Sequence, residues 1–138
     1  MHLKRQVVVN APAEQVWKVI AHDFAQIDRW ASAVARSTAV TGSSVSTDAE
    51  ISGRTCLVPG FGQIQENIIY YDEQNRRFGY AADGVLPFLV KRVESHCSVQ
   101  PQGPDRSVLV LRPEFELRSL LGLLVAPIMR WRVWLTKR

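Results

Sequence analysis

Six segments with alternating apolar and polar residues constrain the fold of this chain most strongly. Such alternation is typical of β-strands that bury one face. The segments are residues 37–41, 50–58, 63–71, 77–82, 88–99 and 107–115. Clusters of Gly, Pro, Asn, Asp and Ser separate them, as expected of tight turns. Because no helix-length segment interrupts the series, a parallel βαβ arrangement is excluded and an antiparallel meander is predicted.

One further strand and two short helices are predicted before this series. Residues 3–9 are strand-like, and Pro12 and Glu14 then suit the first turn of a helix that ends near His22. A second short helix is expected over residues 23–30. The side chains expected to point inward are Val16, Trp17 and Ile20 on the first helix, and Phe24, Ile27 and Trp30 on the second.

The end of the chain, residues 117–138, predicts one long amphipathic helix with a kink at Pro127. Its apolar face comprises Leu117, Leu121, Leu124, Ile128, Trp131 and Leu135. The uninterrupted apolar part, residues 120–129, is about half of the roughly 20 residues needed to span a bilayer. We therefore do not expect this helix to cross a membrane. A curled sheet with a single helix laid across it leaves a hollow, so the predicted elements imply an internal cavity.

Length and composition favour a single globular domain over residues 1–138, because 46% of the 138 residues are hydrophobic and 22% are charged. Residues 1–5 lead directly into the first strand without the apolar core of a signal peptide, which predicts a cytoplasmic protein. Cys56 and Cys97 are too few for a disulfide framework and are expected to be buried free thiols.

The formal net charge of +4 raises the question of an acidic partner. The basic residues come in scattered pairs, so a solvated surface is the better interpretation and nucleic acid is not an expected partner. Trp131 and Trp134 stand among basic residues, which leaves membrane contact open as a less favoured alternative. The sequence does not indicate an oligomeric state.

Several short stretches occur in an order typical of one superfamily: residues 10–17 (NAPAEQVW), Asp23 and Phe24 with Ile27 and Trp30, residues 59–62 (PGFG) with Glu66, residues 71–73 (YDE), and the terminal helix. The chain resembles the START-like, Bet v 1-like (SRPBCC) superfamily of polyketide cyclase/dehydrase and lipid-transport proteins. The resemblance implies the α+β helix-grip fold: a curved seven-stranded antiparallel β-sheet wrapped around a long C-terminal α-helix, with two short helices after the first strand. This superfamily includes carriers, hormone receptors and enzymes, so fold alone does not select an activity.

Two turns, residues 58–62 and 83–87, are more apolar than hairpin tips usually are. In the plant hormone-receptor branch, loops at similar positions act as a gate and a latch over the cavity mouth. The alternative is that these turns pack against the terminal helix or a neighbouring subunit. No lysine occurs in residues 30–36, where that branch's ligand-carboxylate lysine is sought, so the same hormone is not expected.

Alternation predicts which strand residues face inward. On residues 63–71 the inward set is Ile64, Glu66, Ile68 and Tyr70, and Glu66 then needs a charged partner, for which Arg54 on the preceding strand is the best candidate. On residues 88–99 the predicted inward set is Leu89, Lys91, Val93, Ser95, Cys97 and Val99, with Arg92, Glu94 and His96 outward. The reverse register of this strand remains the alternative.

The sequence contains no nucleophile, phosphate-binding or dinucleotide motif, and its three histidines have no metal-ligand spacing. No metal and no cofactor are therefore expected. Glu66, Arg54 and Tyr80 are candidate acid–base groups for cyclisation or dehydration in a cavity. They serve equally well as a buried polar network that orients a passive ligand, and we favour that interpretation.

We therefore predict a domain that carries, sequesters or senses a small hydrophobic or amphipathic molecule held between the terminal helix and the sheet. The alternative function is that of a polyketide cyclase or dehydratase. The predicted ligand-binding residues are Arg54, Phe61, Ile64, Glu66, Tyr80, Leu86, Leu89, Val93, Leu121, Leu124, Val125 and Ile128.

Overall fold

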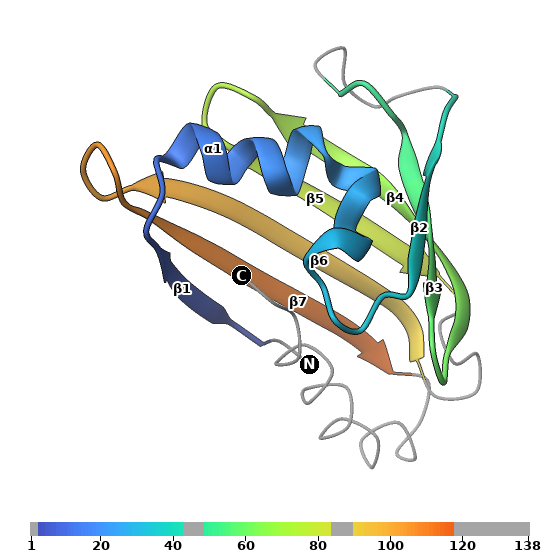
Figure 1. Ribbon diagram of the computed structural model, residues 1–138. Helices are drawn as coiled ribbons and strands as arrows, with labels where there is room; N and C mark the ends of the chain where they lie inside the picture. The colour runs from blue at the N-terminus through green and yellow to red at the C-terminus, as the bar shows by residue number, and fades with distance from the viewer. Residues whose placement is uncertain (1–2, 43–48, 84–89, 118–138) are drawn as a thin grey trace.

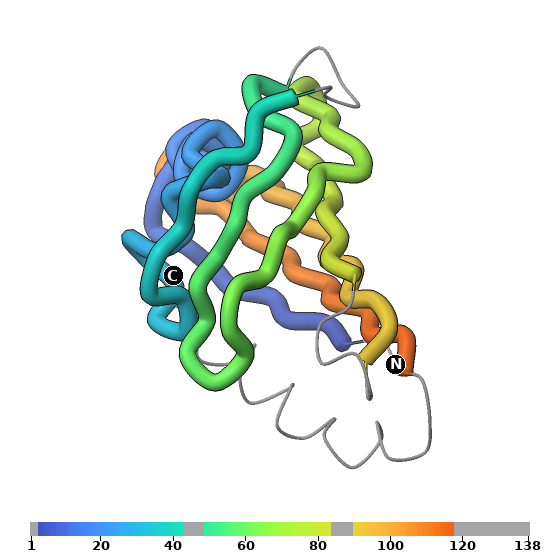
Figure 2. Tube along the Cα trace, turned by 90° about the vertical axis from the view of Figure 1, so that its right-hand side faces the viewer, coloured from blue at the N-terminus to red at the C-terminus, as the bar shows by residue number. Residues whose placement is uncertain are grey.

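Seven antiparallel strands form one curled sheet, with the helical segments on one of its faces (Figures 1 and 2). The computed structural model describes residues 3–42, 49–83 and 90–117 of the chain. The strands are β1 (Arg5–Val9), β2 (Arg36–Val40), β3 (Gly53–Val58), β4 (Gly62–Asp72), β5 (Arg77–Asp83), β6 (Val90–Pro101) and β7 (Ser107–Leu117). Their order in the sheet, β1-β7-β6-β5-β4-β3-β2, confirms the predicted meander.

Leu117, the first residue of the predicted terminal helix (residues 117–138), is instead the last residue of β7. The rest of that helix falls on residues 118–138, and the second apolar turn falls largely on residues 84–89. Both lie outside the described residues. No helix in the described part of the chain is long and apolar enough to span a bilayer.

The connection from β1 to β2 contains three short helical pieces: α1 (Ala13–Trp17), the π-helical turn η1 (Lys18–His22) and the 3₁₀ segment η2 (Phe24–Arg29). The prediction of one regular helix to His22 was wrong in detail, because the backbone N–H of Asp23 donates to the carbonyl of Lys18, five residues back. Pro12 is the N-cap and not the first helical residue. The predicted inward residues Val16, Trp17, Ile20, Phe24 and Ile27 are all buried.

The main core lies between the helical pieces and the inner face of the sheet. Trp17 and Phe24 both contact the ring of Phe78 on β5 edge-on, each with ring centroids 5.6 Å apart. Cys97 and Val99 on β6 and Leu109 on β7 belong to the same buried cluster. Aromatic pairs of this geometry contribute beyond the area that they bury. The helical pieces are therefore anchored over β5, β6 and β7.

A β-bulge in β4 reverses the alternation of that strand. The pairing of β4 with β5 shifts between Ile68 and Tyr70, and a bulge of this kind inserts an extra residue. Ile68 is buried, whereas Tyr70 is 38% exposed and Tyr71 packs against the main core. The prediction that Tyr70 points inward was therefore wrong, and Tyr71 takes the inward position.

A second register shift lies between Val90 and Arg92 in β6. Val90 is fully buried at this shift, while Lys91 is exposed and pairs with Glu116 of β7 at 3.3 Å. The predicted inward position of Lys91 was thus also wrong. Beyond the shift the predicted register holds, because Ser95 and Cys97 border the hollow described below while Glu94 and His96 occupy the opposite face.

Candidate functional site

A hollow lies between the helical pieces and the inner face of β5, β6 and β7. Its walls are mostly apolar and include Ile20, Ile27, Trp30, Phe78, Leu111 and Pro113, while its polar lining includes Arg54, Tyr80 and Ser95. Its volume of about 100 Å³ is below the roughly 300–1,000 Å³ of typical ligand pockets. The space bounded by the described residues therefore accommodates a small group or one part of a larger molecule.

Arg54 supplies a buried positive charge to this hollow. Its residue is only 2% exposed, and its Nε donates a hydrogen bond of 2.8 Å to Oε1 of Glu66 on the neighbouring strand. The two residues face each other directly in the β3–β4 register. The predicted pair between Glu66 and Arg54 is thereby confirmed.

The remaining contacts of Arg54 come from the helical segment and from β5. Its Nη1 donates to the backbone carbonyl of Phe24 at 2.9 Å, and its Cζ lies 3.8 Å from the centroid of the Phe24 ring. The Tyr80 ring centroid is 4.7 Å from the same Cζ. Cation–π contacts of this kind are strengthened by exclusion of water. Arg54 thus links β3, β4, β5 and η2 at one point.

The guanidinium of Arg54 remains charged in this site. Burial by itself lowers the pKa of Arg54, but the negative charge of Glu66 opposes burial and leaves this pKa above its ordinary value. An arginine in this state provides fixed N–H donors and does not exchange protons with a ligand.

Glu66 is held mainly by its partners on β3. Its side chain is 19% exposed, and Oε1 accepts from Arg54 and from the thiol of Cys56, whose Sγ is 3.5 Å away. Glu66 is not among the residues that line the hollow. To act as a general base on a ligand, its carboxylate would first have to leave the ion pair with Arg54.

Tyr80 presents a neutral hydroxyl to the hollow. Burial, and secondarily the charge of Glu66, raises the pKa of Tyr80 well above its ordinary value near 10. Its hydroxyl hydrogen-bonds the side chain of Ser95, which lies opposite Tyr80 in the β5–β6 register. Tyr80 and Ser95 therefore form a hydrogen-bonding pair on the wall.

The two cysteines are free, buried and protonated at neutral pH. Burial raises the pKa of Cys56 to about 11 and that of Cys97 to about 12. Only the thiolate is an effective nucleophile, so neither residue suits covalent catalysis. Among the described residues the hollow thus combines apolar walls with hydrogen-bond donors.

The twelve predicted ligand-binding residues divide into three groups. Arg54 and Tyr80 line the hollow, and Glu66 adjoins it through Arg54. Phe61 and Val93 pack instead on Val90 and Phe115, while Ile64 is half-buried opposite Cys56. The other six lie outside the described residues: Leu86, Leu89, Leu121, Leu124, Val125 and Ile128. A ligand-binding role for each of the twelve stays a prediction.

Sequence reasoning missed several contacts and residues in and around the hollow. Phe24 was predicted to be inward, but its carbonyl and ring were not connected with Arg54, because a backbone contact leaves no signal in side-chain patterning. Leu111 and Pro113 on β7 were read only as strand residues. Leu111 and Pro113 are two residues apart and therefore share one face of the strand, and this spacing could have indicated that both point inward.

The chain belongs to the family described as polyketide cyclase / dehydrase and lipid transport, whose family model matches residues 1–134. This confirms the superfamily resemblance noted in the sequence. No curated protein matches the sequence significantly.

Solved structures show the same fold at low sequence identity. The protein XoxI from Bacillus cereus is 17% identical with a TM-score of 0.78, and the match covers 98% of this chain and 89% of that one. A START superfamily protein from Mycobacterium smegmatis is 17% identical with a TM-score of 0.71, covering 96% and 91%. Norcoclaurine synthase from Thalictrum flavum is 18% identical with a TM-score of 0.68, covering 93% and 82%.

Proposed function

We propose that this domain binds a small hydrophobic or amphipathic molecule on the inner face of its sheet, as a carrier, sequestering protein or sensor. The observation that carries the proposal is the buried Arg54 guanidinium in a mostly apolar hollow. Ligand sites typically combine apolar walls with a few convergent polar groups. Membership of a family that includes lipid-transport proteins supports the same function.

The lining suggests the chemistry of the ligand. Ile20, Ile27 and Leu111 offer contacts to an apolar body, while Arg54 and Tyr80 offer hydrogen-bonding groups at one side. Glu66 already balances the charge of Arg54, so a second carboxylate is less suitable than a neutral acceptor. We expect a mainly apolar molecule that carries a carbonyl or hydroxyl oxygen.

The predicted terminal helix would complete the proposed site. Leu121, Leu124, Val125 and Ile128 would form the wall opposite the sheet, and the turns at residues 58–62 and 83–87 would flank the entrance. In the first of these turns, Phe61 packs on Val90 and Phe115. An opening movement of this turn would have to break that contact.

A cyclase or dehydratase is the second candidate. The polar set of Arg54, Glu66 and Tyr80 beside a hollow favours it, as does the family description, which names polyketide cyclase / dehydrase. However, Glu66 is engaged by Arg54, and the raised pKa of Tyr80 makes its hydroxyl a weak acid. General acid–base catalysis works best with groups that titrate near the working pH. We therefore place binding first.

An apolar fluorescent dye tests the proposal directly. The wild-type protein should bind the dye with increased emission, and Leu111→Trp should weaken binding by filling the hollow beside Pro113. Val8→Trp is the matched control, because Val8 is 55% exposed on β1 and the added ring lies away from the hollow. Absence of dye binding by the wild type, or equal binding by both tryptophan variants, would refute the proposed location.

A further inference from the structure

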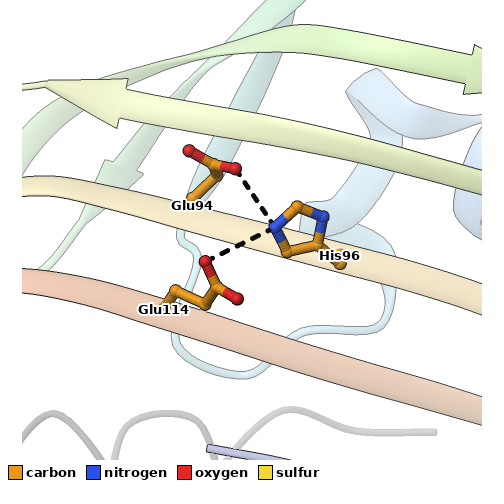
Figure 3. A group of neighbouring side chains, drawn as sticks. All are labelled: Glu94, His96 and Glu114. Atoms are coloured by element: carbon orange, nitrogen blue, oxygen red, sulfur yellow. Dashed lines mark ion pairs between the residues drawn. The ribbon is translucent and has the colours of Figure 1, made fainter. Parts of the chain in front are cut away.

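The outer face of the sheet carries a second group of polar side chains that the proposed ligand site does not use. Glu94 and His96 on β6 and Glu114 on β7 point toward one another (Figure 3). Glu94 and His96 are two residues apart and so share a face, and Glu114 lies opposite Glu94 in the β6–β7 register. One nitrogen or oxygen atom from each side chain lies within 4.8 Å of the other two.

The distances suit a single small cation between these atoms. Nε2 of His96 lies 3.2 Å from Oε1 of Glu94 and 3.8 Å from Oε2 of Glu114. A tetrahedral zinc ion with bonds of about 2.0–2.2 Å holds its ligand atoms roughly 3.3–3.6 Å apart. Small side-chain rotations are therefore sufficient, and the strands need not move.

The two carboxylates of the group also favour a cation. Two carboxylates directly opposite each other on neighbouring strands repel. Arg92 offsets part of this repulsion by donating to Oε2 of Glu94 at 3.2 Å, which leaves Oε1 directed at His96. Arg77 and Arg112 line the adjoining groove together with Glu114. The carboxylate of Glu94 is thus held by a hydrogen bond, as ligating carboxylates commonly are.

Tyr70 orients the histidine. Its Oη lies 2.9 Å from Nδ1 of His96, and the two rings stack with centroids 5.7 Å apart. The ring of Tyr70 crosses over Gly79, where a Cβ would approach it to 2.3 Å. When Nδ1–H donates to Tyr70, the lone pair of Nε2 faces the carboxylates. Metal-binding histidines usually have a hydrogen bond of this kind on their other nitrogen.

We propose that Glu94, His96 and Glu114 bind a divalent transition-metal ion of the zinc type on the outer face of the sheet. One imidazole nitrogen and two carboxylate oxygens suit zinc better than magnesium or calcium, which prefer oxygen ligands alone. The ion binds the lone pair of Nε2 and lies between this nitrogen and the two carboxylate oxygens. Water completes the coordination, and the ion links β6 to β7.

The test uses the full chain without an affinity tag and zinc alone, measured by titration calorimetry. The wild type should bind one ion per chain, and cobalt in its place should give the visible absorption of a tetrahedral site. His96→Ala and Glu114→Gln should lose binding by at least about 100-fold, and Tyr70→Phe should weaken it by about 10–100-fold. Glu116→Gln is the matched control, because Glu116 pairs with Lys91 outside the group.

Two results would overturn the assignment: a wild type that binds no zinc at submillimolar concentration, or equal binding by the wild type, His96→Ala and Glu114→Gln. Should His96→Ala fail to fold by circular dichroism, Glu114→Gln decides, because it only replaces one partly exposed carboxylate by an amide of the same size. Apolar dye binding should be the same in all of these folded variants, since the hollow lies on the opposite face. Failure of the metal site is thereby distinguished from failure of the proposed ligand site.

Discussion

At the scale of single residues, the pair of Arg54 and Glu66 shows what sequence patterns reveal about a buried site. Alternation predicted that Glu66 lies among inward neighbours and that Arg54 is its partner, because an unpaired buried charge is costly. The contacts of Arg54 with Phe24 were not predictable in the same way. They depend on how η2 packs on the sheet, which local sequence does not determine.

Removing one member of this pair should destabilise the fold. Arg54→Met leaves the Glu66 carboxylate without its main partner, and the expected loss in the free energy of unfolding is about 3 kcal/mol, at the lower end for broken buried pairs because Glu66 is 19% exposed. The double variant Arg54→Met/Glu66→Gln removes both charges and should recover at least half of this loss. Urea denaturation of the variants checks this, and an equal loss in both variants would contradict it.

The same double variant separates binding from catalysis. A carrier with Glu66→Gln and Arg54→Met should still bind apolar dyes, because affinity comes mainly from the apolar walls. An enzyme that used Glu66 as its base would keep the fold but lose turnover by about 10²–10⁴-fold. We expect dye binding to persist and no cyclisation or dehydration to be detectable in the wild type. An activity that disappears in the double variant would reverse this ranking.

The two buried cysteines predict a loss of stability at alkaline pH. Burial raises the pKa of Cys56 from 9.0 to about 11 and that of Cys97 from 9.0 to about 12, so the unfolded chain releases these protons first. The stability that these thiols contribute is therefore fully present below pH 9 and falls as the pH rises from 9 toward 11 for Cys56 and toward 12 for Cys97. Each thiol contributes a slope of about 1.4 kcal/mol per pH unit.

Cys97→Ala tests this assignment. Above pH 9 the free energy of unfolding of the variant should fall less steeply with pH, by the contribution of one thiol, even if the variant is less stable at every pH. The measurement is the free energy of unfolding from urea titrations at pH 8, 9, 10 and 11. An unchanged slope in the variant would mean that Cys97 does not titrate as its burial implies.

At the scale of elements, the strand sequence was predictable while the bulges were not. Tyr70 and Tyr71 are chemically identical neighbours, so hydrophobic alternation gives no sign that the bulge before them exchanges their faces. Lys91 was wrongly predicted to point inward because alternation also gives no sign of the register shift beside it. That shift arises in the pairing of β6 with β7. The π-helical turn of η1 (Lys18–His22) is likewise not indicated by helix propensity.

Two strand glycines should differ in how strictly they are required. A Cβ at Gly53 would lie 2.3 Å from the backbone carbonyl oxygen of Glu66, whereas a Cβ at Gly79 would lie 2.3 Å from the ring of Tyr70. A ring can rotate away but a paired strand cannot, so Gly53→Ala should destabilise by about 3 kcal/mol and Gly79→Ala by about 1 kcal/mol.

Thermal or urea unfolding of both alanine variants checks this order, and Tyr70→Ala added to Gly79→Ala provides the control. In the Tyr70→Ala background, Gly79→Ala should cost much less, because the obstructing ring is gone. Similar losses in the free energy of unfolding for Gly53→Ala and Gly79→Ala would contradict this order. They would show that the paired strand backbone moves as readily as a side chain.

At the scale of the whole molecule, element order and superfamily were predictable because they rest on many weak signals that agree. The seven-stranded antiparallel order and the family assignment follow the predicted pattern closely. The lining of the hollow could not be predicted from alternation alone. It comes from η1, η2 and four strands, and alternation describes each strand separately. The outer group of Glu94, His96 and Glu114 was missed because Glu114 joins the other two only across the β6–β7 pairing.

The sheet order also bears on the folding kinetics. β1 pairs with β7, so Val7 meets Leu109 across roughly 100 residues of chain, whereas β6 and β7 are joined by a short turn. Closing a loop of that length costs about 4 kcal/mol of chain entropy, against about 1.4 kcal/mol for a loop of about five residues. We expect β1 to dock late, so that Val7→Ala mainly accelerates unfolding while Val99→Ala in β6 mainly slows folding. Stopped-flow measurements of both variants test this, and equal effects of the two on the folding rate would contradict it.

Until β1 pairs with β7, β7 is an unpaired edge strand of the partly folded sheet. Its unpaired N–H and C=O groups then offer a template to any other extended chain, and Leu109 and Leu111 add apolar surface to that edge. If β1 docks late, as expected, the first strand therefore protects the folding protein against aggregation as well as completing its sheet.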